Sequence, residues 1–323
     1  MLVSKFLNIC QTSLLRDISL VKENYNNFCK FYDKTNFYII CPDQQISEFR
    51  NNLNYSNINL INENSIISLE DFKKNLRDTK LDDEFSQKLN SRISWYYQQV
   101  LKLSFIIDFS IKYRENILIW DADTIILKKI KFFNEERSIS YGTLSEFHCP
   151  YFNTISSIFK KLPKNYISSL LQFSAVTPEE VDFLKENLNQ YYNIENLNIP
   201  QWISKIVIKS IIEANKVYDG SMFSEYELIG ISKILQHKNI KQKIMLTLRS
   251  RLDGKLNKNQ LRLSKFFNFM HVTYEHSHHK KYSKDMLMRQ QKWTRLFHIL
   301  LKNVIKIIIY KLNQILFNTN GKN

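Results

Sequence analysis

The sequence predicts an α/β fold in which helices flank a mostly parallel β-sheet. Over residues 6–110, apolar runs alternate with amphipathic helical segments, which is the pattern of successive βα units. The chain of 323 residues is 44% hydrophobic and 13% aromatic, enough to build a large buried core. We therefore expect one α/β domain over residues 1–276, followed by a basic helical tail over residues 277–323.

The first elements follow from the local spacing of apolar residues. Asp17 is placed to cap a helix whose apolar residues recur at intervals of three and four. Pro42 and Asp43 end the second strand. The predicted elements are, in order, a strand over 6–10, a helix over 18–31, a strand over 37–41, a helix over 46–53, a strand over 58–61, a mixed segment over 66–90, a helix over 95–109 and a strand over 116–120.

The second half of the chain gives weaker signals. We predict a strand over residues 138–144, mainly helix over 153–215 with breaks at the prolines, and strands over 244–248 and 266–271 that return to the sheet. Residues 289–317 contain neither proline nor glycine and indicate one long amphipathic helix.

Charge is concentrated in the tail. The formal net charge is +15, and residues 277–323 hold ten Lys or Arg against the single acid Asp285. The rest of the chain is only mildly basic, which argues against a nucleic-acid partner. The tail has no uncharged apolar run near the roughly 18 residues that a membrane span needs. A lysine stripe beside a wide apolar face suits a helix lying on an anionic membrane surface, the alternative being packing on its own domain or in a dimer.

Cysteine and glycine usage exclude several classes of site. The four cysteines are scattered without a C-x-x-C pair, which argues for a reducing compartment and against zinc or disulfides. The five glycines never take the spacing of a P-loop or a dinucleotide-binding loop. Any nucleotide phosphate must therefore be held by a metal ion or by side chains.

Asp121 and Asp123 stand where one apolar run ends and another begins. Two carboxylates at the end of a buried strand can share a divalent cation such as Mg²⁺ or Mn²⁺, which would hold a diphosphate. The alternative is that these acids simply end a strand at a turn.

The preceding helix carries polar residues on one side. Arg92 and Lys102 could neutralise a diphosphate, and Gln98 or Gln99 could bind sugar hydroxyls. On a generic helix the same residues would form a solvated face.

Four segments together resemble a group of bacterial GT-A-type glycosyltransferases, described as DUF6492-like and found among genes for cell-surface polysaccharides such as capsule and lipopolysaccharide. The segments are Arg92 with W-Y-Y-Q-Q-V-L-K-L over 95–103, W-D-A-D-T over 120–124, E-F-H-C-P-Y-F over 146–152 and F-S-E-Y-E-L-I-G over 223–230. The resemblance covers residues 5–276 and implies a GT-A-like, Rossmann-like fold.

The resemblance also implies a nucleotide-sugar donor, in the first place a UDP-sugar, together with Mn²⁺ or Mg²⁺. Asp123 would bind the metal, and Asp121 would contact the metal or the ribose. The residues expected along the donor are Arg92, Gln98, Gln99 and Lys102, and those expected to border the nucleotide are Thr12, Asp17 and Asp43.

Glu225 and Glu227 are the candidates for a catalytic base that takes the acceptor's proton. Ser224 and Glu227 also fit a capping box, which leaves Glu225 as the stronger candidate. We expect Glu146 and His148 to hold the acceptor, although a loop with a packed aromatic end is the plainer interpretation.

His271 follows an apolar run and could complete the metal site, although a histidine at a strand end is more often structural. The histidines at 276, 278 and 279 lie close by in a stretch that could bind metal adventitiously.

The expected protein is a transferase at the inner face of the cytoplasmic membrane, peripheral to it, acting on a surface glycan or a lipid-linked acceptor. A haloacid-dehalogenase-type phosphatase with Asp121 as nucleophile is an alternative, because residues 119–124 fit its motif. A membrane-surface or nucleic-acid adaptor without enzymatic activity, which would act through the basic tail, is a further alternative.

Overall fold

The structure is a computed structural model that describes residues 6–78, 87, 89–144, 146–163, 166–192, 197–214, 221–238, 240–250, 258–274, 301 and 305. Of the predicted tail helix it includes only Leu301 and Ile305, which are helical and 49% and 46% exposed. The rest of that helix lies outside the described residues. Within the described part, no helix has the length and apolar character required to cross a membrane.

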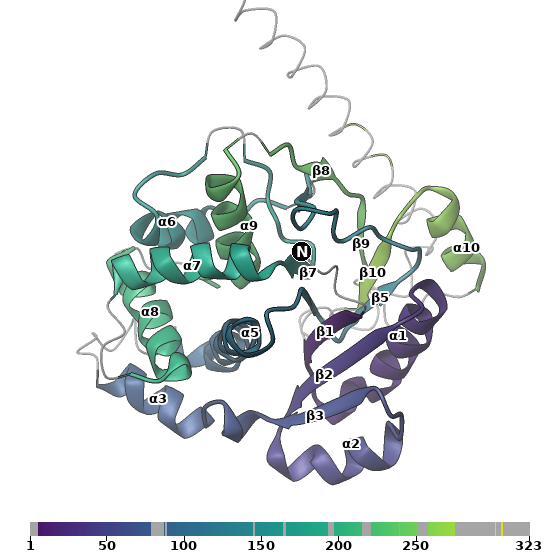
Figure 1. Ribbon diagram of the computed structural model, residues 1–323, viewed down its shortest axis with the longest axis horizontal. Coiled ribbons are helices and arrows are strands. Elements are labelled where there is room, and N and C mark those ends of the chain that lie inside the picture. Colours follow the sequence, from purple (N-terminus) through teal and green to yellow (C-terminus); the bar gives the residue numbers. More distant parts are fainter. Residues whose placement is uncertain are drawn as a thin grey trace, which may run out of the picture.

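A five-stranded sheet with strand order β3-β2-β1-β4-β7 forms the centre of the molecule (Figure 1). Its strands are β1 (Leu7–Thr12), β2 (Thr35–Cys41), β3 (Ile58–Asn62), β4 (Ile117–Trp120) and β7 (Phe173–Val176). The first four are parallel, and β7 pairs antiparallel with β4. The predicted α/β class with a mostly parallel, Rossmann-like sheet is therefore confirmed. Because parallel strands end at the same edge, the residues that follow β1, β2 and β4 share one edge of the sheet.

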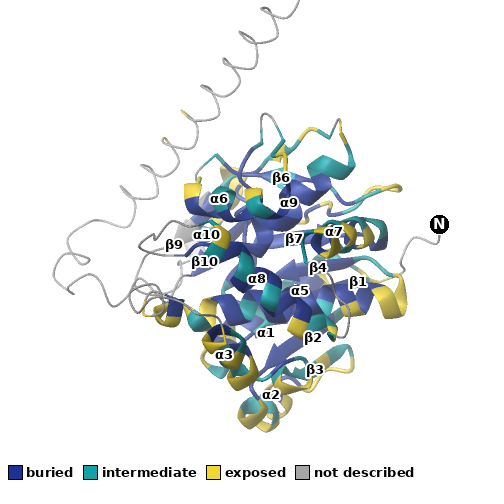
Figure 2. Cartoon of the chain, turned by 90° about the vertical axis from the view of Figure 1, so that its left-hand side faces the viewer, coloured by how far each residue is buried: buried dark blue, intermediate teal, exposed yellow. Residues whose placement is uncertain are grey.

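Helices cover both faces of this sheet (Figure 1). The helices are α1 (Ile18–Phe31), α2 (Ile46–Asn52), α3 (Leu69–Arg77), α5 (Ile93–Tyr113), α6 (Cys149–Ile158), α7 (Pro178–Tyr191), α8 (Ile199–Glu213), α9 (Glu225–Gln236) and α10 (Lys258–Phe266). Neighbouring residues of β1 point to opposite faces, so that Ile9 joins a core cluster with Phe28 of α1, whereas Cys10 joins one with Val100 of α5. Figure 2 shows β4 and β7 in the buried colour, whereas the edge strand β3 and the outer helices α2 and α3 carry half-buried and exposed residues.

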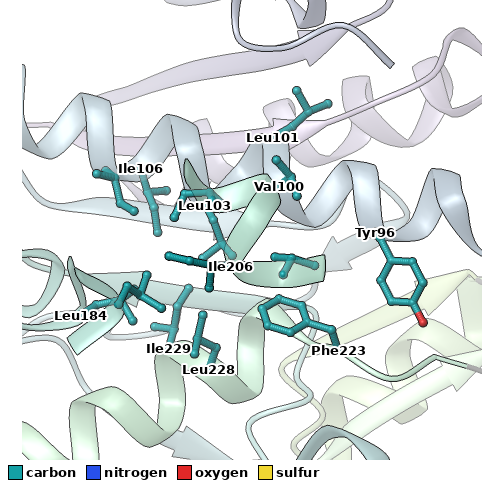
Figure 3. Close-up of a cluster of buried hydrophobic side chains, with 14 of the residues drawn as sticks. Tyr96, Val100, Leu101, Leu103, Ile106, Leu184, Ile206, Phe223, Leu228 and Ile229 are labelled. Atoms are coloured by element: carbon teal, nitrogen blue, oxygen red, sulfur yellow. The ribbon is translucent and has the colours of Figure 1, made fainter. Parts of the chain in front are cut away.

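Helix α5 is buried along most of its length. Figure 3 shows Val100, Leu103 and Ile106 of α5 in one hydrophobic cluster with Ile206 of α8 and Leu228 of α9. This packing explains the dense apolar sequence of the helix. It also leaves Lys102 only 4% exposed, so that its ammonium group requires partners within the protein.

Two small sheets flank the central one. Strands β5 (Thr124–Ile126), β10 (His271–Tyr274) and β9 (Thr247–Ser250) form the first, in the order β5-β10-β9. Strands β6 (Tyr141–Gly142) and β8 (Lys243–Ile244) form the second. The apolar run after Asp123 therefore leaves the central sheet and begins a separate one.

Several predictions for the second half were wrong. The segment 266–271 was predicted as a strand, but α10 ends at Phe266 and β10 begins only at His271. Only residues 141–142 of the predicted strand 138–144 are in a sheet, and it is not the central one. The mainly helical segment 153–215 contains β7, which the sequence analysis missed. The predicted strand 244–248 is divided between β8 and β9.

Candidate active site

The candidate site is centred on the buried ammonium group of Lys102. Its Nζ donates to Asp121 Oδ1 at 2.6 Å and to Glu225 Oε1 at 2.7 Å. The Tyr226 hydroxyl donates to the same Asp121 oxygen, also at 2.6 Å. Lys102 lies on α5, Asp121 follows β4, and Glu225 begins α9. The fold thus joins residues from three segments that are distant in the sequence.

Opposite charges hold this centre together. Burial alone lowers the pKa of Lys102, but the negative charges of Asp121 and Glu225 and the hydrogen bonds to both outweigh it, and the pKa rises above its usual range. Burial raises the pKa of Glu225, Lys102 opposes that rise, and the charge of Asp121 adds to it. Burial raises the pKa of Tyr226, and the charges of Asp121, Glu225 and Asp123 raise it further. Lys102 therefore stays protonated at physiological pH.

The first turn of α9 is anchored to α5. Gln99 Oε1 accepts a hydrogen bond from Glu225 N at 2.9 Å. Ser224 occupies the N-cap position of α9, and its side chain accepts from Glu227 N at 3.4 Å. This is one half of the predicted capping box. Together these bonds fix the position from which Glu225 and Tyr226 reach Lys102 and Asp121.

The carboxylate of Glu227 lies in a separate network. It accepts hydrogen bonds from the Tyr166 hydroxyl, from Ser168 Oγ at 2.5 Å and from Ser169 N at 3.0 Å. The side chain is fully buried, and this burial raises its pKa above the usual value, against the effect of the three donors. Gly230, one turn further along α9, packs so closely that an added Cβ would lie 2.2 Å from Ser169 Oγ. The network therefore joins α9 to the segment before β7.

Asp121 and Asp123 flank a tight turn between β4 and β5. Thr124 N donates to Asp121 O at 3.0 Å, which closes the turn. Trp120 Nε1 donates to Thr124 O at 2.6 Å, and Tyr274 N donates to Asp123 O at 2.8 Å. Both carboxyl groups are half-buried, so they sit at the boundary between the protein interior and solvent.

His271 lies further along the small sheet. His271 on β10 pairs with Ile126 on β5. Ile126 follows Asp123 by three residues, so His271 lies about 10 Å along the strand from Asp123. Its fully buried ring packs edge-on against Trp120 and Phe173, with centroids 5.9 and 5.7 Å away. Ligands of one metal ion lie about 2 Å from it. A metal role for His271 stays a prediction, and it has no part in the function proposed below.

The residues predicted to border the nucleotide lie near the carboxyl edge of the sheet. Thr12 ends β1, and Asp43 follows β2 and accepts from Asn62 Nδ2 at 2.6 Å. Asp17 stands at the N-terminus of α1, but its side chain makes no capping hydrogen bond, so the predicted capping role was wrong. A short 3₁₀ turn over Leu15–Asp17 begins the helix instead.

The predicted acceptor loop approaches the segment that leads into α9. His148 Nε2 lies 2.8 Å from Ser221 O and its ring contacts Tyr151, whereas Glu146 is half-buried. Of the predicted donor residues on α5, Arg92 is exposed at the N-cap and Gln98 is half-buried. The ligand-binding roles of all these residues stay predictions.

Comparison with known proteins shows the family. Residues 11–246 match a family of unknown function, DUF6492. The chain belongs to the DUF6492 family. No curated protein sequence matches the DUF6492 chain.

Among solved structures, the DUF6492 protein is similar to the galactosyltransferase LgtC in complex with donor and acceptor sugar analogues, with 8% identity, a TM-score of 0.41, and coverage of 92% of this chain and 96% of the other. Mouse xyloside xylosyltransferase 1 in its apo form gives 8% identity, a TM-score of 0.40, and coverage of 84% and 98%.

The acidic residues of this DUF6492 protein suit a divalent cation bound together with a diphosphate. The Oδ1 atom of Asp121 is occupied by Lys102 and Tyr226, but the side chain is 20% exposed and Oδ2 accepts no hydrogen bond from a described residue. Asp123 brings a second half-buried carboxylate. No cluster of three or more His, Cys, Asp or Glu suited to a metal occurs among the described residues. Mg²⁺ commonly takes one or two carboxylates and completes its shell with substrate phosphates and water, so two are sufficient.

Sequence reasoning missed one residue of this site and one buried polar residue at the end of β1. Tyr226 hydrogen-bonds Asp121, but in the sequence it is one aromatic residue in an amphipathic helix. Gln11 of β1 is fully buried, and neither amide atom has a hydrogen-bond partner among the described residues. A buried amide without partners is costly, which marks the end of β1 as a place where water or a ligand is expected. Strand β1 also contains Asn8 and Thr12, so nothing in the sequence sets Gln11 apart.

Proposed function

We propose that this protein is a metal-dependent glycosyltransferase that uses a nucleotide-sugar donor, with a UDP-sugar as the first candidate. The observation that carries the proposal is the joining of the Asp121–Asp123 turn to the buried cation of Lys102 at the carboxyl edge of the sheet. Ligands of open α/β sheets bind outside the carboxyl ends of the strands. The chain also lacks a glycine-rich phosphate loop, which leaves a metal ion or side chains to hold a diphosphate, and the two aspartates favour the metal ion.

Lys102 is a positioning residue in this proposal. Its side chain is 5% exposed and both of its short contacts go to carboxylates, so it orients Asp121 instead of contacting the donor. With Lys102 and Tyr226 on Oδ1, the Oδ2 atom of Asp121 is left to face the ligand. When bound, Mn²⁺ or Mg²⁺ would neutralise the charge that develops on the leaving nucleoside diphosphate.

Glu225 also positions the centre. Its side chain is 2% exposed and forms a 2.7 Å ion pair with Lys102, whereas a general base must reach an acceptor hydroxyl. We therefore assign Glu225 to the support of Lys102, and Glu227 to the attachment of α9 through Tyr166, Ser168 and Ser169.

The acceptor proposed is a surface glycan or a lipid-linked sugar, bound beside Glu146 and His148. The contact between His148 and Ser221 brings that loop to the segment just before α9, which supports this placement. A lipid-linked acceptor agrees with a peripheral position at the inner membrane face, for which the basic tail provides the charge.

The phosphatase alternative is less consistent with the fold. Its aspartate motif opens the domain, whereas here β1, β2 and β3 precede β4 in the same sheet. Of the later aspartates, Asp182 on α7 pairs with Arg114 at 2.7 Å, and those at 219, 253 and 285 lie outside the described residues.

Donor hydrolysis tests the proposal. Wild type and Asp123→Asn are incubated with UDP-, GDP-, CMP- and dTDP-sugars and Mn²⁺, and the released nucleotide is measured. We expect release from one nucleotide class by the wild type and its loss in the variant. Release from none of them, together with turnover of a generic phosphomonoester, would replace the transferase with a phosphatase.

A further inference from the structure

The turn between α10 and β10 presents two aromatic rings to solvent. Phe266 is 81% exposed and Phe267 is 36% exposed. Their rings contact each other edge-on, with centroids 5.3 Å apart. Figure 1 places α10 at the outer edge of the molecule, beside β9, β10 and β5. Single exposed apolar residues are common, but an adjacent aromatic pair at a protruding turn suggests contact with a partner.

The backbone of this turn is fixed. Asn268 takes a left-handed conformation with φ of 62°, and its N–H donates to Lys265 O at 3.1 Å. Phe269 N donates to Ser264 O at 3.0 Å, and the Phe269 ring is fully buried in the cluster beneath the small sheet. The outward position of Phe266 and Phe267 is therefore set by an anchored turn.

Basic residues lie close to the aromatic pair in the sequence, and a further lysine contacts the turn. Arg262 and Lys265 are exposed, and neither forms an ion pair with any residue that the structure describes. Lys128 Nζ donates to Asn268 Oδ1 at 3.0 Å. Residues 258–274 contain three Lys or Arg and no Asp or Glu. The turn therefore combines an apolar tip with a positive surround.

We propose that the α10–β10 turn docks on an anionic lipid surface, with Phe266 and Phe267 entering the headgroup region and Arg262, Lys265 and Lys128 contacting lipid phosphates. Apolar side chains such as Phe beside Lys and Arg are a common composition of interfacial anchors. Each basic residue near an anionic leaflet strengthens binding by about fivefold. The docking surface lies within the folded domain, is separate from the basic tail, and does not depend on the proposed transferase activity.

The position of the turn connects the membrane to the candidate site. Strand β10 runs from this turn to Tyr274, whose N–H donates to Asp123 O. The chain between Phe267 and Tyr274 spans at most about 25 Å. Docking here would hold the Asp121–Asp123 turn close to the membrane surface, where lipid-linked molecules are found.

Vesicle binding by the full chain tests the proposal. Partitioning onto phosphatidylglycerol-containing and onto pure phosphatidylcholine vesicles is measured for wild type, Phe266→Ser and the double variant with Phe267→Ser. The control pair is Ile111→Ser with Tyr113→Ser, because these α5 residues are 44% and 50% exposed and flank a lysine. Since the tail is present in every variant, differences report the turn alone.

We expect wild type to bind the anionic vesicles, the Phe266 and Phe267 double variant to lose about tenfold or more in partitioning, and the control pair to bind as wild type does. Arg262→Glu with Lys265→Glu should weaken binding to anionic vesicles alone. The proposal is overturned if wild type does not bind, or if the double variant and the control behave alike. It is equally overturned if wild type binds duplex DNA as tightly as it binds vesicles, and if the Phe substitutions change neither the affinity for DNA nor the affinity for vesicles.

Discussion

Replacing Lys102 with methionine should lower the free energy of unfolding by about 3–5 kcal/mol, because it leaves a buried carboxylate unpaired. Glu225 is 2% exposed and Lys102 is its ion-pair partner, whereas Asp121 is 20% exposed and keeps Tyr226. Glu225 can escape the penalty by taking up a proton. Protonating an ordinary glutamate at about pH 7 costs about 3.5 kcal/mol, which agrees with the size of the expected loss.

The penalty should depend on pH. In Lys102→Met the folded-state pKa of Glu225 is raised further above its unfolded value, so stability is greatest below the unfolded pKa and is lost as pH rises through the folded one. Urea unfolding should therefore give a loss of about 1 kcal/mol at about pH 5 and the full loss at about pH 7.

The double variant Lys102→Met with Glu225→Gln provides the control. It should recover most of the lost stability and show no such pH dependence, since the charge that needed a partner is gone. Equal losses for the single and double variants, or a single-variant loss below about 1 kcal/mol at both pH values, would refute the assignment of Lys102 and Glu225 as buried charges that compensate each other.

Three further changes test the surroundings of the site. Gly230→Ala should cost about 1–3 kcal/mol in thermal or urea unfolding, because the new Cβ meets Ser169, and adding Ser169→Gly should recover only part of the loss, because Tyr166 Oη would still lie 2.7 Å from that Cβ. Burial raises the pKa of Glu227 above its unfolded value. The free energy of unfolding of the wild type, measured relative to that of Glu227→Gln, should therefore fall as the pH rises above about 4.5. A difference in unfolding free energy that does not change with pH would contradict this. Tyr226→Phe should lower stability by about 1–3 kcal/mol and weaken nucleotide binding in a titration, because Asp121 loses one donor on Oδ1.

The first half of the fold could be predicted because each element has a local signal. Strand β4 is a buried continuous apolar run, β1 and β2 each contain a short buried apolar stretch, and α1 and α5 repeat apolar residues at helical spacing. Strand β7 has only four residues and is a strand because it pairs with β4, which no local pattern reveals. The apolar run 266–270 resembles a strand in composition, but Asn268 turns the chain, so Phe266 and Phe269 have opposite exposures.

The candidate site could be predicted in its residues but not in their connections. Asp121, Lys102 and Glu225 each stood out in the sequence, yet nothing local indicates that one ammonium group joins both carboxylates. That arrangement depends on tertiary packing of α5 against α9. For the same reason Glu225 was assigned to acceptor chemistry, whereas its burial against Lys102 supports a positioning role.

Titration calorimetry of UDP and GDP, with and without Mn²⁺, tests the central claim most directly. The variants are Asp123→Asn and, as a control, Lys233→Met, which alters another buried lysine whose Nζ donates to Ala175 O at 3.0 Å. One nucleotide should bind the wild type only with Mn²⁺, bind Lys233→Met equally, and fail to bind Asp123→Asn. Binding by Asp123→Asn as tight as wild type, or no binding of these nucleotides or of CMP and dTDP, would contradict a nucleotide-sugar site at the Asp121–Asp123 turn.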